Sequence, residues 1–253
     1  MPHTTHGTIS IVSHGHGPLV RNLLRDLVAQ DDIDNWHVIL TLNIPEDISE
    51  SDLAGLRATV VRNSRLKGFG ENHNAAAEMA QGELFVIVNP DIRLIAPDTL
   101  VQLVAEEWGG DRPALRAPIV VAPDGGREDS VRRNLSLFNL LHRARHRVDG
   151  WEADPTGPEF FWLAGMFLIA PIDTFRALGG FDERFRLYCE DYDLSARWRI
   201  GGGRVEIMPN LKVVHDARRD SHRSFRHMKW HVASLLRVWR SAPFWKIVAM
   251  QGR

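Results

Sequence analysis

Three carboxylates lie within four residues of one another, at Glu190, Asp191 and Asp193, where the pattern predicts the start of a helix. Like charges this close repel, and a helix N-terminus partly relieves the repulsion. A carboxylate in this setting can act as a general base when a substrate hydroxyl comes within hydrogen-bond reach. A charged helix N-terminus without chemistry has the same pattern, so the cluster indicates a base only together with other residues.

A second candidate site is the segment Asn89-Pro90-Asp91, which directly follows five apolar residues, Leu84–Val88. Open α/β sheets bind ligands at the carboxyl ends of their strands. A carboxylate there can hold Mg²⁺ or Mn²⁺, which prefer oxygen ligands and bridge to substrate phosphates. His215 ends a later apolar run, and Mn²⁺ accepts its imidazole more readily than Mg²⁺ does. A capped turn and a packed imidazole are the structural alternatives.

The elements that must position these residues alternate in type through the first half of the chain. Apolar runs predict strands at four places, 9–13, 36–42, 58–61 and 84–88. A helix that opens at Pro18 follows the first strand, and an Ala-rich helix over 72–81 ends at Gly82. The first helix has an apolar stripe at helical spacing, Leu19, Leu23, Leu27 and Val28. This alternation predicts an α/β fold with a mostly parallel sheet.

The second half is less regular. We expect the Arg-rich stretch 113–147 to be an excursion over the surface. Further elements are expected at five places, namely a strand over 160–170, helices over 171–178 and 191–200, and strands over 204–208 and 212–214. No linker divides the chain, so we expect a single domain over 1–253 whose sheet continues through both halves.

Charge is unevenly distributed along the chain. Residues 1–60 carry three basic and eight acidic side chains, whereas 212–253 carry ten basic and two acidic ones. Apolar residues recur at spacings of three and four from 224 to 240, at Phe225, Met228, Val232, Leu235 and Trp239. This predicts a basic amphipathic helix within 222–253. This helix has two possible settings. It would either lie in a membrane interface, where anionic lipid favours each Lys or Arg by about 1 kcal/mol, or pack on the domain or on a second subunit.

Composition narrows the class of protein. With 44% hydrophobic and 25% charged residues, the chain is neither a disordered protein nor a collagen-like fibre nor a disulfide scaffold. No stretch reaches the roughly 20 apolar residues of a spanning helix. Residues 1–7 lack the apolar core of a secretory signal, and a lone cysteine, Cys189, fits a reducing compartment. We therefore expect a cytoplasmic protein, peripheral on the inner face of the cytoplasmic membrane if the basic helix binds lipid.

Taken in order, these blocks resemble family 2 glycosyltransferases. The blocks similar to the donor-binding half are Gly68-Phe69-Gly70, Asn74-Ala75-Ala76 and 82–91. The blocks similar to the acceptor half of the rhamnosyltransferase-like branch are Trp162-Leu163-Ala164-Gly165, 179–185, Glu190-Asp191-Tyr192-Asp193-Leu194 and His215. The resemblance covers about residues 8 to 221. Its specificity lies in the combination of the Asn-Pro-Asp and Glu-Asp blocks, about a hundred residues apart.

The resemblance implies a GT-A fold, a Rossmann-like, mostly parallel central sheet flanked by helices, here with a C-terminal amphipathic helical extension. Its parts would be a nucleotide-sugar-binding half, 8–95, an acceptor half, 96–221, and the extension, 222–253. The implied activity is inverting transfer of a sugar from a nucleotide diphosphate to a hydroxyl of a cell-surface glycan such as O-antigen, free or lipid-linked. The Asn-Pro-Asp form favours L-rhamnose from dTDP-rhamnose, with a UDP-hexose donor as the alternative.

The resemblance also assigns roles to single residues. Asp191 matches the catalytic base, with Glu190 beside it. Asp91 and His215 match ligands of a divalent cation, Mg²⁺ or Mn²⁺. The implied donor-binding residues are Ser13, Asn43, Arg65, Gly68, Asn74, Asn89, Asp91 and Gly165. The implied acceptor-binding residues are Asp193 and Trp162.

Three positions depart from the family pattern. Asn89 replaces the first acid of the metal motif, Asn43 lies where an acid usually follows the second strand, and Leu66-Lys67 replaces the Asn before Gly-Phe-Gly. The donor nucleotide and the strictness of the metal requirement therefore stay open.

Two other classes of function remain to be weighed. A catalytically silent sugar-nucleotide or glycan-binding module on the same fold would need Asp91 but not Asp191. A nucleic-acid binder would use the basic tail on phosphates, but it leaves the carboxylate blocks unexplained and no recognised motif supports it. We expect no nucleic-acid partner.

Overall fold

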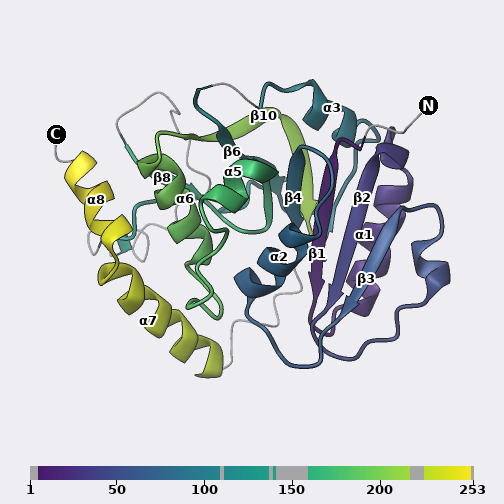
Figure 1. Ribbon diagram of the computed structural model, residues 1–253, viewed down its shortest axis with the longest axis horizontal. Helices are drawn as coiled ribbons and strands as arrows, with labels where there is room; N and C mark the ends of the chain where they lie inside the picture. Colours follow the sequence, from purple (N-terminus) through teal and green to yellow (C-terminus); the bar gives the residue numbers. More distant parts are fainter. Residues whose placement is uncertain (1–4, 109–110, 137–138, 141–158, 217–224, 252–253) are drawn as a thin grey trace.

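Eight strands of the described residues form one sheet in the order β3-β2-β1-β4-β9-β6-β10-β5 (Figure 1). The structure is a computed structural model of the 253-residue chain, and it describes residues 5–108, 111–136, 139–140, 159–216 and 225–251. Separate apolar clusters pack against the two faces of the sheet. The predicted α/β fold is confirmed, and the sheet runs through both halves of the chain.

The strands of the N-terminal half are parallel, with bounds close to those predicted. They are β1 (Gly7–Ser13), β2 (Trp36–Leu42), β3 (Ala58–Arg62) and β4 (Leu84–Val88). β1 lies between β2 and β4, and β3 pairs with the other side of β2. Nearly every residue of β1, β2 and β4 is buried, as in a parallel sheet that is covered on both faces.

Helices α1 (Gly17–Val28) and α2 (Phe69–Glu78) cover opposite faces of these strands. The first turn of α1 contains Pro18, as predicted. Its buried face holds Val20 and Leu24, whereas Val28, expected in the apolar stripe, is 44% exposed. Val28 therefore lies outside the buried stripe of α1. Shorter helices are η1 (Ile33–Asn35), η2 (Glu50–Leu53) and α3 (Thr99–Ala105).

Four further strands complete the sheet. They are β5 (Ile92–Arg93), β6 (Ala114–Val121), β9 (Phe167–Pro171) and β10 (Arg204–His215). β9 runs antiparallel to both β4 and β6, β10 runs parallel to β6, and β5 closes the edge antiparallel to β10. The expected surface excursion over 113–147 is wrong for its first part, because β6 is a buried strand inside the sheet; 141–147 lies outside the described residues.

Two other expected elements differ from the structure. The run 160–170 is not one strand: β8 (Phe161–Leu163) pairs with β7 (Val131–Arg133) in a separate two-stranded sheet, and β9 begins after a turn at 164–166. Both pieces are buried, so an apolar run does not mark the turn. Conversely, the expected strands 204–208 and 212–214 form one strand, β10, with an irregular register between Met208 and Lys212.

The remaining helices of the described residues are α5 (Ile172–Ala177), α6 (Glu190–Ile200), α7 (Phe225–Trp239) and α8 (Ala242–Gln251). The expected single C-terminal helix is therefore two helices, which run down one side of the molecule (Figure 1). Of the expected stripe on α7, Leu235 and Trp239 pack against a buried apolar cluster, whereas Met228 and Val232 are exposed. Residues 222–224 and 252–253 of the extension, and 217–221 before it, lie outside the described residues. Among the described helices, none is long and apolar enough to span a bilayer.

Candidate active site

Three of the expected donor residues lie at the carboxyl ends of neighbouring parallel strands. Ser13 ends β1, Asn43 follows β2 and Asn89 follows β4. The backbone amide of Asn43 donates a 2.9 Å hydrogen bond to the backbone carbonyl of Ser13. The side chain of Asn43 also binds the backbone of Lys67, which fixes the loop before α2. These residues form the sheet edge at which ligands of such folds bind.

Asp91 and His215 meet because the two-residue strand β5 pairs with the end of the long strand β10. β5 binds the end of β10 with His215 opposite Ile92, and the amide of Asp216 donates to the Asp91 carbonyl over 2.8 Å. This register brings Nε2 of His215 to 3.2 Å from Oδ2 of Asp91. Two residues that are 124 positions apart therefore form one polar pair.

The polar atoms around this pair fit a divalent cation shared with a substrate. Oδ1 of Asp91 and Nδ1 of His215 are buried and have no hydrogen-bond partner. Glu128, from the loop after β6, has Oε1 4.0 Å from that Nδ1. No group of three or more potential ligands arranged to hold a metal occurs in the part of the chain that the structure describes. A cation here would take Asp91 and His215 and complete its coordination with phosphate oxygens and water, as Mg²⁺ and Mn²⁺ often do.

The pKa of His215 reports the same environment. Burial by itself lowers the pKa of His215, but the hydrogen bond to Asp91 and the charges of Asp91, Glu128 and Asp216 outweigh it and raise the pKa above its ordinary value. The site thus attracts positive charge. A metal ion would replace the proton, because metal binding requires a neutral imidazole.

Asp191 lies in the first turn of α6 and is held by two backbone amides. Its Oδ2 accepts a hydrogen bond from Gly165 and its Oδ1 accepts one from Tyr192, both 2.9 Å long. Gly165 lies in the turn between β8 and β9, and a Cβ built there would be 3.3 Å from the Phe69 ring and 3.7 Å from Cβ of Asp191. The contact with the Phe69 ring is tight enough to favour glycine, whereas the distance to Asp191 is an ordinary van der Waals contact.

This turn also contacts the donor edge of the sheet. The backbone amide of Asn89 donates a 2.9 Å hydrogen bond to the carbonyl of Met166, which directly follows Gly165. A short path of backbone therefore connects Asp191, through Gly165 and Met166, with the Asn89–Asp91 segment. The structure brings together the carboxylate and cation candidates that lie about a hundred residues apart in sequence.

Glu190 and Asp191 have different surroundings although they are neighbours. Glu190 is 4% exposed and its Oε2 has no hydrogen-bond partner. Burial, and then the charge of Asp191, raises the pKa of Glu190 well above its ordinary value. Burial also raises the pKa of Asp191, but Arg132 and the amides of Gly165 and Tyr192 oppose the rise. Glu190 is therefore the carboxyl that retains its proton, and Asp191 carries the charge.

The start of α6 has an unusual backbone. Tyr188 and Cys189 both adopt left-handed conformations, with φ of 73° and 66°. Such conformations are uncommon outside glycine, and strained backbone is frequent at functional sites. Cys189 is buried, and burial raises the pKa of its thiol, so it is suited to packing and not to nucleophilic attack.

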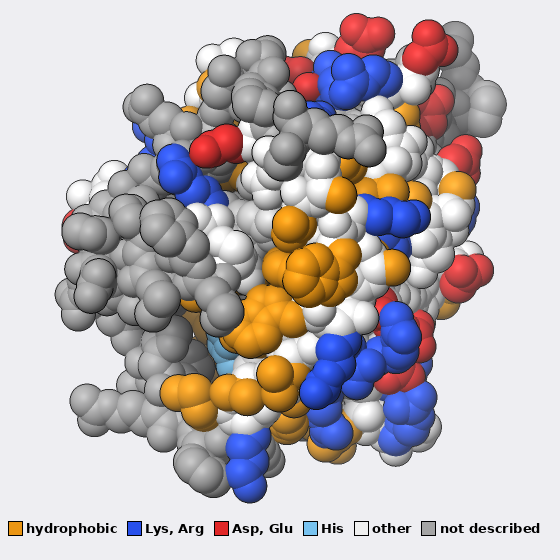
Figure 2. Space-filling model, turned by 90° about the vertical axis from the view of Figure 1, so that its left-hand side faces the viewer, with side chains coloured by type: hydrophobic (Ala, Val, Ile, Leu, Met, Phe, Trp, Pro, Cys, Tyr) orange, Lys and Arg blue, Asp and Glu red, His pale blue; other side chains and the backbone are white. Residues whose placement is uncertain are grey.

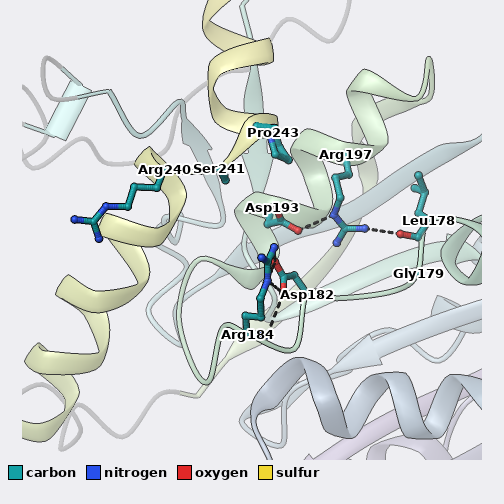
Figure 3. Close-up of a pocket in the computed structure, with 10 residues that line it drawn as sticks. Leu178, Gly179, Asp182, Arg184, Asp193, Arg197, Arg240, Ser241 and Pro243 are labelled. Carbon is teal, nitrogen blue, oxygen red and sulfur yellow. Dashed lines mark hydrogen bonds and ion pairs between the residues drawn. The ribbon is translucent and has the colours of Figure 1, made fainter.

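The two expected acceptor residues lie in structural contacts. Asp193 is 4% exposed, and its Oδ2 accepts a 2.6 Å hydrogen bond from Arg197, one turn along α6. This ion pair borders a pocket of about 490 Å³ between α6, the 178–184 segment and the α7–α8 turn (Figure 3). Trp162 is 3% exposed, and its ring nitrogen donates to the carbonyl of Arg133. Neither side chain is presented to solvent beside Asp191.

Three further expected donor residues join α2 to its neighbours. Gly68 precedes α2, and a Cβ there would be 3.0 Å from the carbonyl oxygen of Arg186. Asn74 exchanges hydrogen bonds of 2.8 and 2.9 Å with the backbone of Phe181. Arg65 is exposed and paired with Glu71. These contacts position α2 beside the site, and they occupy the side chains of Asn74 and Arg65.

Sequence reasoning missed three charged residues at the site. Glu46 binds the Ser13 hydroxyl over 2.8 Å and the Gly15 amide over 2.9 Å, and Glu128 approaches His215. Arg132 in β7 acts on the charge of Asp191. For Glu46 a signal existed, because it is the first acid after β2, directly beyond the Leu42–Pro45 segment. Glu128 and Arg132 lie in the stretch expected to be a surface excursion.

Comparison with known families gives a match over most of the chain. The profile described as "Glycosyl transferase family 2" matches residues 8–164. The matched range contains β1 to β4, the Asn89–Asp91 segment and β8.

Curated relatives have modest identity. The Rhamnosyltransferase WbbL of Escherichia coli (strain K12) is 25% identical over 243 residues, covering 90% of each chain. An N-acetylglucosaminyl-diphospho-decaprenol L-rhamnosyltransferase of Mycobacterium tuberculosis is 27% identical over 169 residues, 60% of this chain and 53% of that protein. The O-antigen biosynthesis protein RfbC of Myxococcus xanthus is 26% identical over 78% of this chain and 16% of its own length.

Solved structures share the fold at lower identity. The mannosyltransferase PcManGT from Pyrobaculum calidifontis, solved with GDP-Man and Mn²⁺, has a TM-score of 0.63 at 20% identity, covering 96% of this chain and 68% of that one. TarS 1–349 of S. aureus, solved with UDP-GlcNAc, has a TM-score of 0.61 at 18% identity, covering 85% of this chain and 59% of that one. The mostly parallel sheet flanked by helices corresponds to these GT-A folds.

Proposed function

This chain belongs to glycosyl transferase family 2, and from this premise we propose that it transfers a sugar, with inversion, from a nucleotide diphosphate to a hydroxyl of a growing cell-surface glycan. The observation that carries the proposal is the hydrogen-bond path from Asp191 through Gly165 and Met166 to Asn89. It joins a base candidate to the edge of the sheet at which the Asp91–His215 pair lies.

The proposed chemistry is a single displacement. Asp191 takes the proton of the acceptor hydroxyl while the hydroxyl oxygen bonds to the anomeric carbon. The bond from that carbon to the donor diphosphate breaks, and the diphosphate leaves with the electron pair. Attack from the side opposite the leaving group inverts the configuration. A divalent cation held by Asp91 and His215 would stabilise the negative charge on the departing diphosphate.

For the donor we infer L-rhamnose carried by dTDP. The support is the name of the E. coli relative, a rhamnosyltransferase that matches over 90% of this chain. A UDP-hexose is the alternative donor, since fold neighbours have been solved with UDP-GlcNAc as well as GDP-Man. Ser13, Asn43, Asn89, Asp91 and Gly165 would line the donor site.

For the acceptor we infer a lipid-linked glycan of the cell surface, such as an O-antigen precursor. The names of the M. tuberculosis and M. xanthus relatives support this class. An acceptor of this kind would bring a cytoplasmic enzyme to the inner face of the membrane. Asp193 and Trp162 would serve the acceptor side indirectly, by holding α6 and the β7–β8 sheet in place.

We also infer that the donor half, 8–95, and the acceptor half, 96–221, act as one domain. This inference is supported by the single sheet to which both halves contribute strands.

The experiment that tests the function is donor binding by thermal shift, with and without Mn²⁺. A ligand that binds only the folded state raises its melting temperature. The panel is dTDP-rhamnose, UDP-glucose, UDP-galactose and GDP-mannose, and we expect the largest shift with dTDP-rhamnose. Folded protein that responds to none of the four would favour a module without a donor site. Donor binding without sugar transfer to any tested acceptor would favour the catalytically silent sugar-nucleotide-binding module.

A further inference from the structure

Helices α7 and α8 expose a group of large apolar side chains. Figure 2 shows hydrophobic side chains gathered on the side of the molecule that carries these helices, next to a group of Lys and Arg side chains. The exposed apolar residues of the two helices are Met228, Val232, Leu236, Trp245 and Met250, with exposed fractions of 62, 50, 39, 60 and 48%. We call them the docking face. Large exposed apolar groups of this kind mark interaction surfaces.

The charges around the docking face have one sign. Residues 225–251 contain no Asp or Glu. The cations of this segment whose side chains the structure describes are Lys229, Arg237, Arg240 and Lys246. Arg240 and Lys246 are exposed. A partner must therefore combine an apolar interior with a negative surface.

The docking face does not carry the packing of these helices on the protein. The hydroxyl of Ser234 donates to the carbonyl of Leu187 over 2.9 Å, and Val238 is buried. In α8 the buried side chains are Phe244 and Ile247. Met228, Val232 and Leu236 are spaced four residues apart, so they share one side of α7, and the packing contacts leave that side uncovered.

We propose that the docking face binds a membrane that contains anionic lipid, with α7 and α8 lying in the plane of the interface. Amphipathic helices with apolar residues, a tryptophan and flanking Lys and Arg bind membranes in this way. The apolar side chains enter the region between headgroups and acyl chains, and the cations contact the headgroups. Membrane binding goes beyond the proposed transfer reaction and does not depend on it.

A second copy of this chain fits the docking face less well. In a symmetric dimer the same patch lies on both partners. Each copy would place Arg240 and Lys246 near the same cations of the other, without an acid from 225–251 between them. A negative lipid surface removes this repulsion.

The same helix connects the docking face with the active site. The inner side of α7 contacts the segment that leads into α6, through Ser234 with Leu187 and through the rings of His231 and Tyr188, whose centres are 4.9 Å apart. Asp191 follows Tyr188 by three residues. Binding at α7 would therefore orient the site relative to the lipid surface.

The test is co-sedimentation of the full chain with vesicles of phosphatidylcholine alone and of phosphatidylcholine with phosphatidylglycerol. We expect binding to the anionic vesicles that weakens in high salt. The double variant Arg240→Glu and Lys246→Glu should bind at least tenfold less, since each cation contributes about a fivefold change in binding. Arg25→Glu, on α1, is the charge control and should bind as the wild type does.

The apolar contribution is tested with Met228→Ser, Val232→Ser and Trp245→Ser combined. Its matched control is Ile95→Ser, because Ile95 is 62% exposed, as Met228 is, but lies outside α7 and α8. Circular dichroism and thermal melting confirm that each variant folds. Wild-type protein that stays in the supernatant with anionic vesicles would overturn the proposal, as would docking-face variants that bind like the controls. A wild-type dimer that the triple variant converts to a monomer, without vesicle binding, would identify a second copy as the occupant instead.

Discussion

The backbone amide of Gly165 donates a 2.9 Å hydrogen bond to Oδ2 of Asp191. This contact joins the turn between β8 and β9 to the first turn of α6. It holds the carboxylate by a backbone group, whose position depends on the fold and not on a side-chain rotamer. Because Met166, the next residue, binds the amide of Asn89, the position of the proposed base is tied to the donor edge of the sheet.

Replacing the proposed base tests the mechanism. Asp191→Asn keeps an oxygen that can accept from Gly165 but removes the basic carboxylate, so we expect transfer to fall about 100-fold or more. Donor binding, measured by thermal shift, should remain near the wild-type value. Asp173→Asn, at a carboxylate that is 96% exposed, serves as the control. Weaker donor binding with normal turnover at saturation would assign Asp191 to the donor instead.

The pH dependence of transfer gives a second test. Only ionised Asp191 can accept a proton, so activity should fall as the pH drops through its pKa. Burial raises that pKa, which moves the acid limb of kcat/KM above the pH at which an ordinary aspartate titrates. Glu190→Gln should leave the limb where it is, because Glu190 is protonated in this range. A limb that moves with Glu190→Gln would show that Glu190 is the titrating group.

Glu190 should also make stability depend on pH. Both the folded and the unfolded chain hold its proton below its ordinary pKa of 4.5, but above that value only the folded chain retains it. The proton that the unfolded chain releases favours unfolding, so the contribution of Glu190 to stability is lost as the pH rises. Glu190→Gln should match the wild type in urea unfolding near pH 4 and exceed it at pH 8. Equal gains at both pH values would contradict the raised pKa.

The cation pair predicts a change in metal and donor binding. Asp91→Asn keeps the shape of the side chain but removes its charge, so Mn²⁺ affinity in the presence of UDP or dTDP should fall by at least about tenfold. Electron paramagnetic resonance of free Mn²⁺ measures this without any turnover. His215→Ala should lower the Mn²⁺ affinity as well, whereas Asp173→Asn should not. Unchanged Mn²⁺ binding in both site variants would remove this pair from the proposed mechanism.

The crowding around Gly165 gives a steric test. In Gly165→Ala the new Cβ lies 3.3 Å from the Phe69 ring and 3.7 Å from Cβ of Asp191. The Phe69 ring or the 164–166 turn must move by a few tenths of an ångström, and we expect transfer to fall about tenfold or more, because the turn holds the base through the Gly165 amide. Gly201→Ala, at the other end of α6, meets a backbone oxygen at 3.3 Å and should lower the melting temperature without affecting transfer. Equal activity losses would indicate general destabilisation.

Local sequence signals were sufficient for the N-terminal half of the fold. The five apolar residues of β4 and the proline of α1 have meanings that depend on near neighbours alone. The sequence of 160–170 does not reveal the turn at 164–166, because that turn is formed by contacts with distant segments, the β7 strand on one side and β4 on the other. Hydrophobicity reports burial, and both sides of this turn are buried.

The residues of the candidate site also divide into those that a local motif reveals and those that only the fold brings into place. The Asn89–Asp91 and Glu190–Asp191 blocks could be recognised because each is a short motif. Glu128 and Arg132 could not, because their relation to His215 and Asp191 arises from the path of the chain after β6. On α7 the spacing of apolar residues was correct, but spacing does not tell which side of a helix meets the protein. Val238 is buried and Val232, six residues earlier, is exposed.

The pairing of β5 with β10 has a consequence for the order in which the protein is assembled. Parallel strands β1 to β4 are complete once Val88 has been synthesised, and domains tend to fold as the chain emerges. Asp91 is present at almost the same moment, but its partner His215 comes 124 residues later. Contacts this distant in sequence form late, because the loop between them must first be closed. A nascent chain therefore has most of its donor-side strands before it has the cation pair, and that pair forms only when the last strand of the sheet is added.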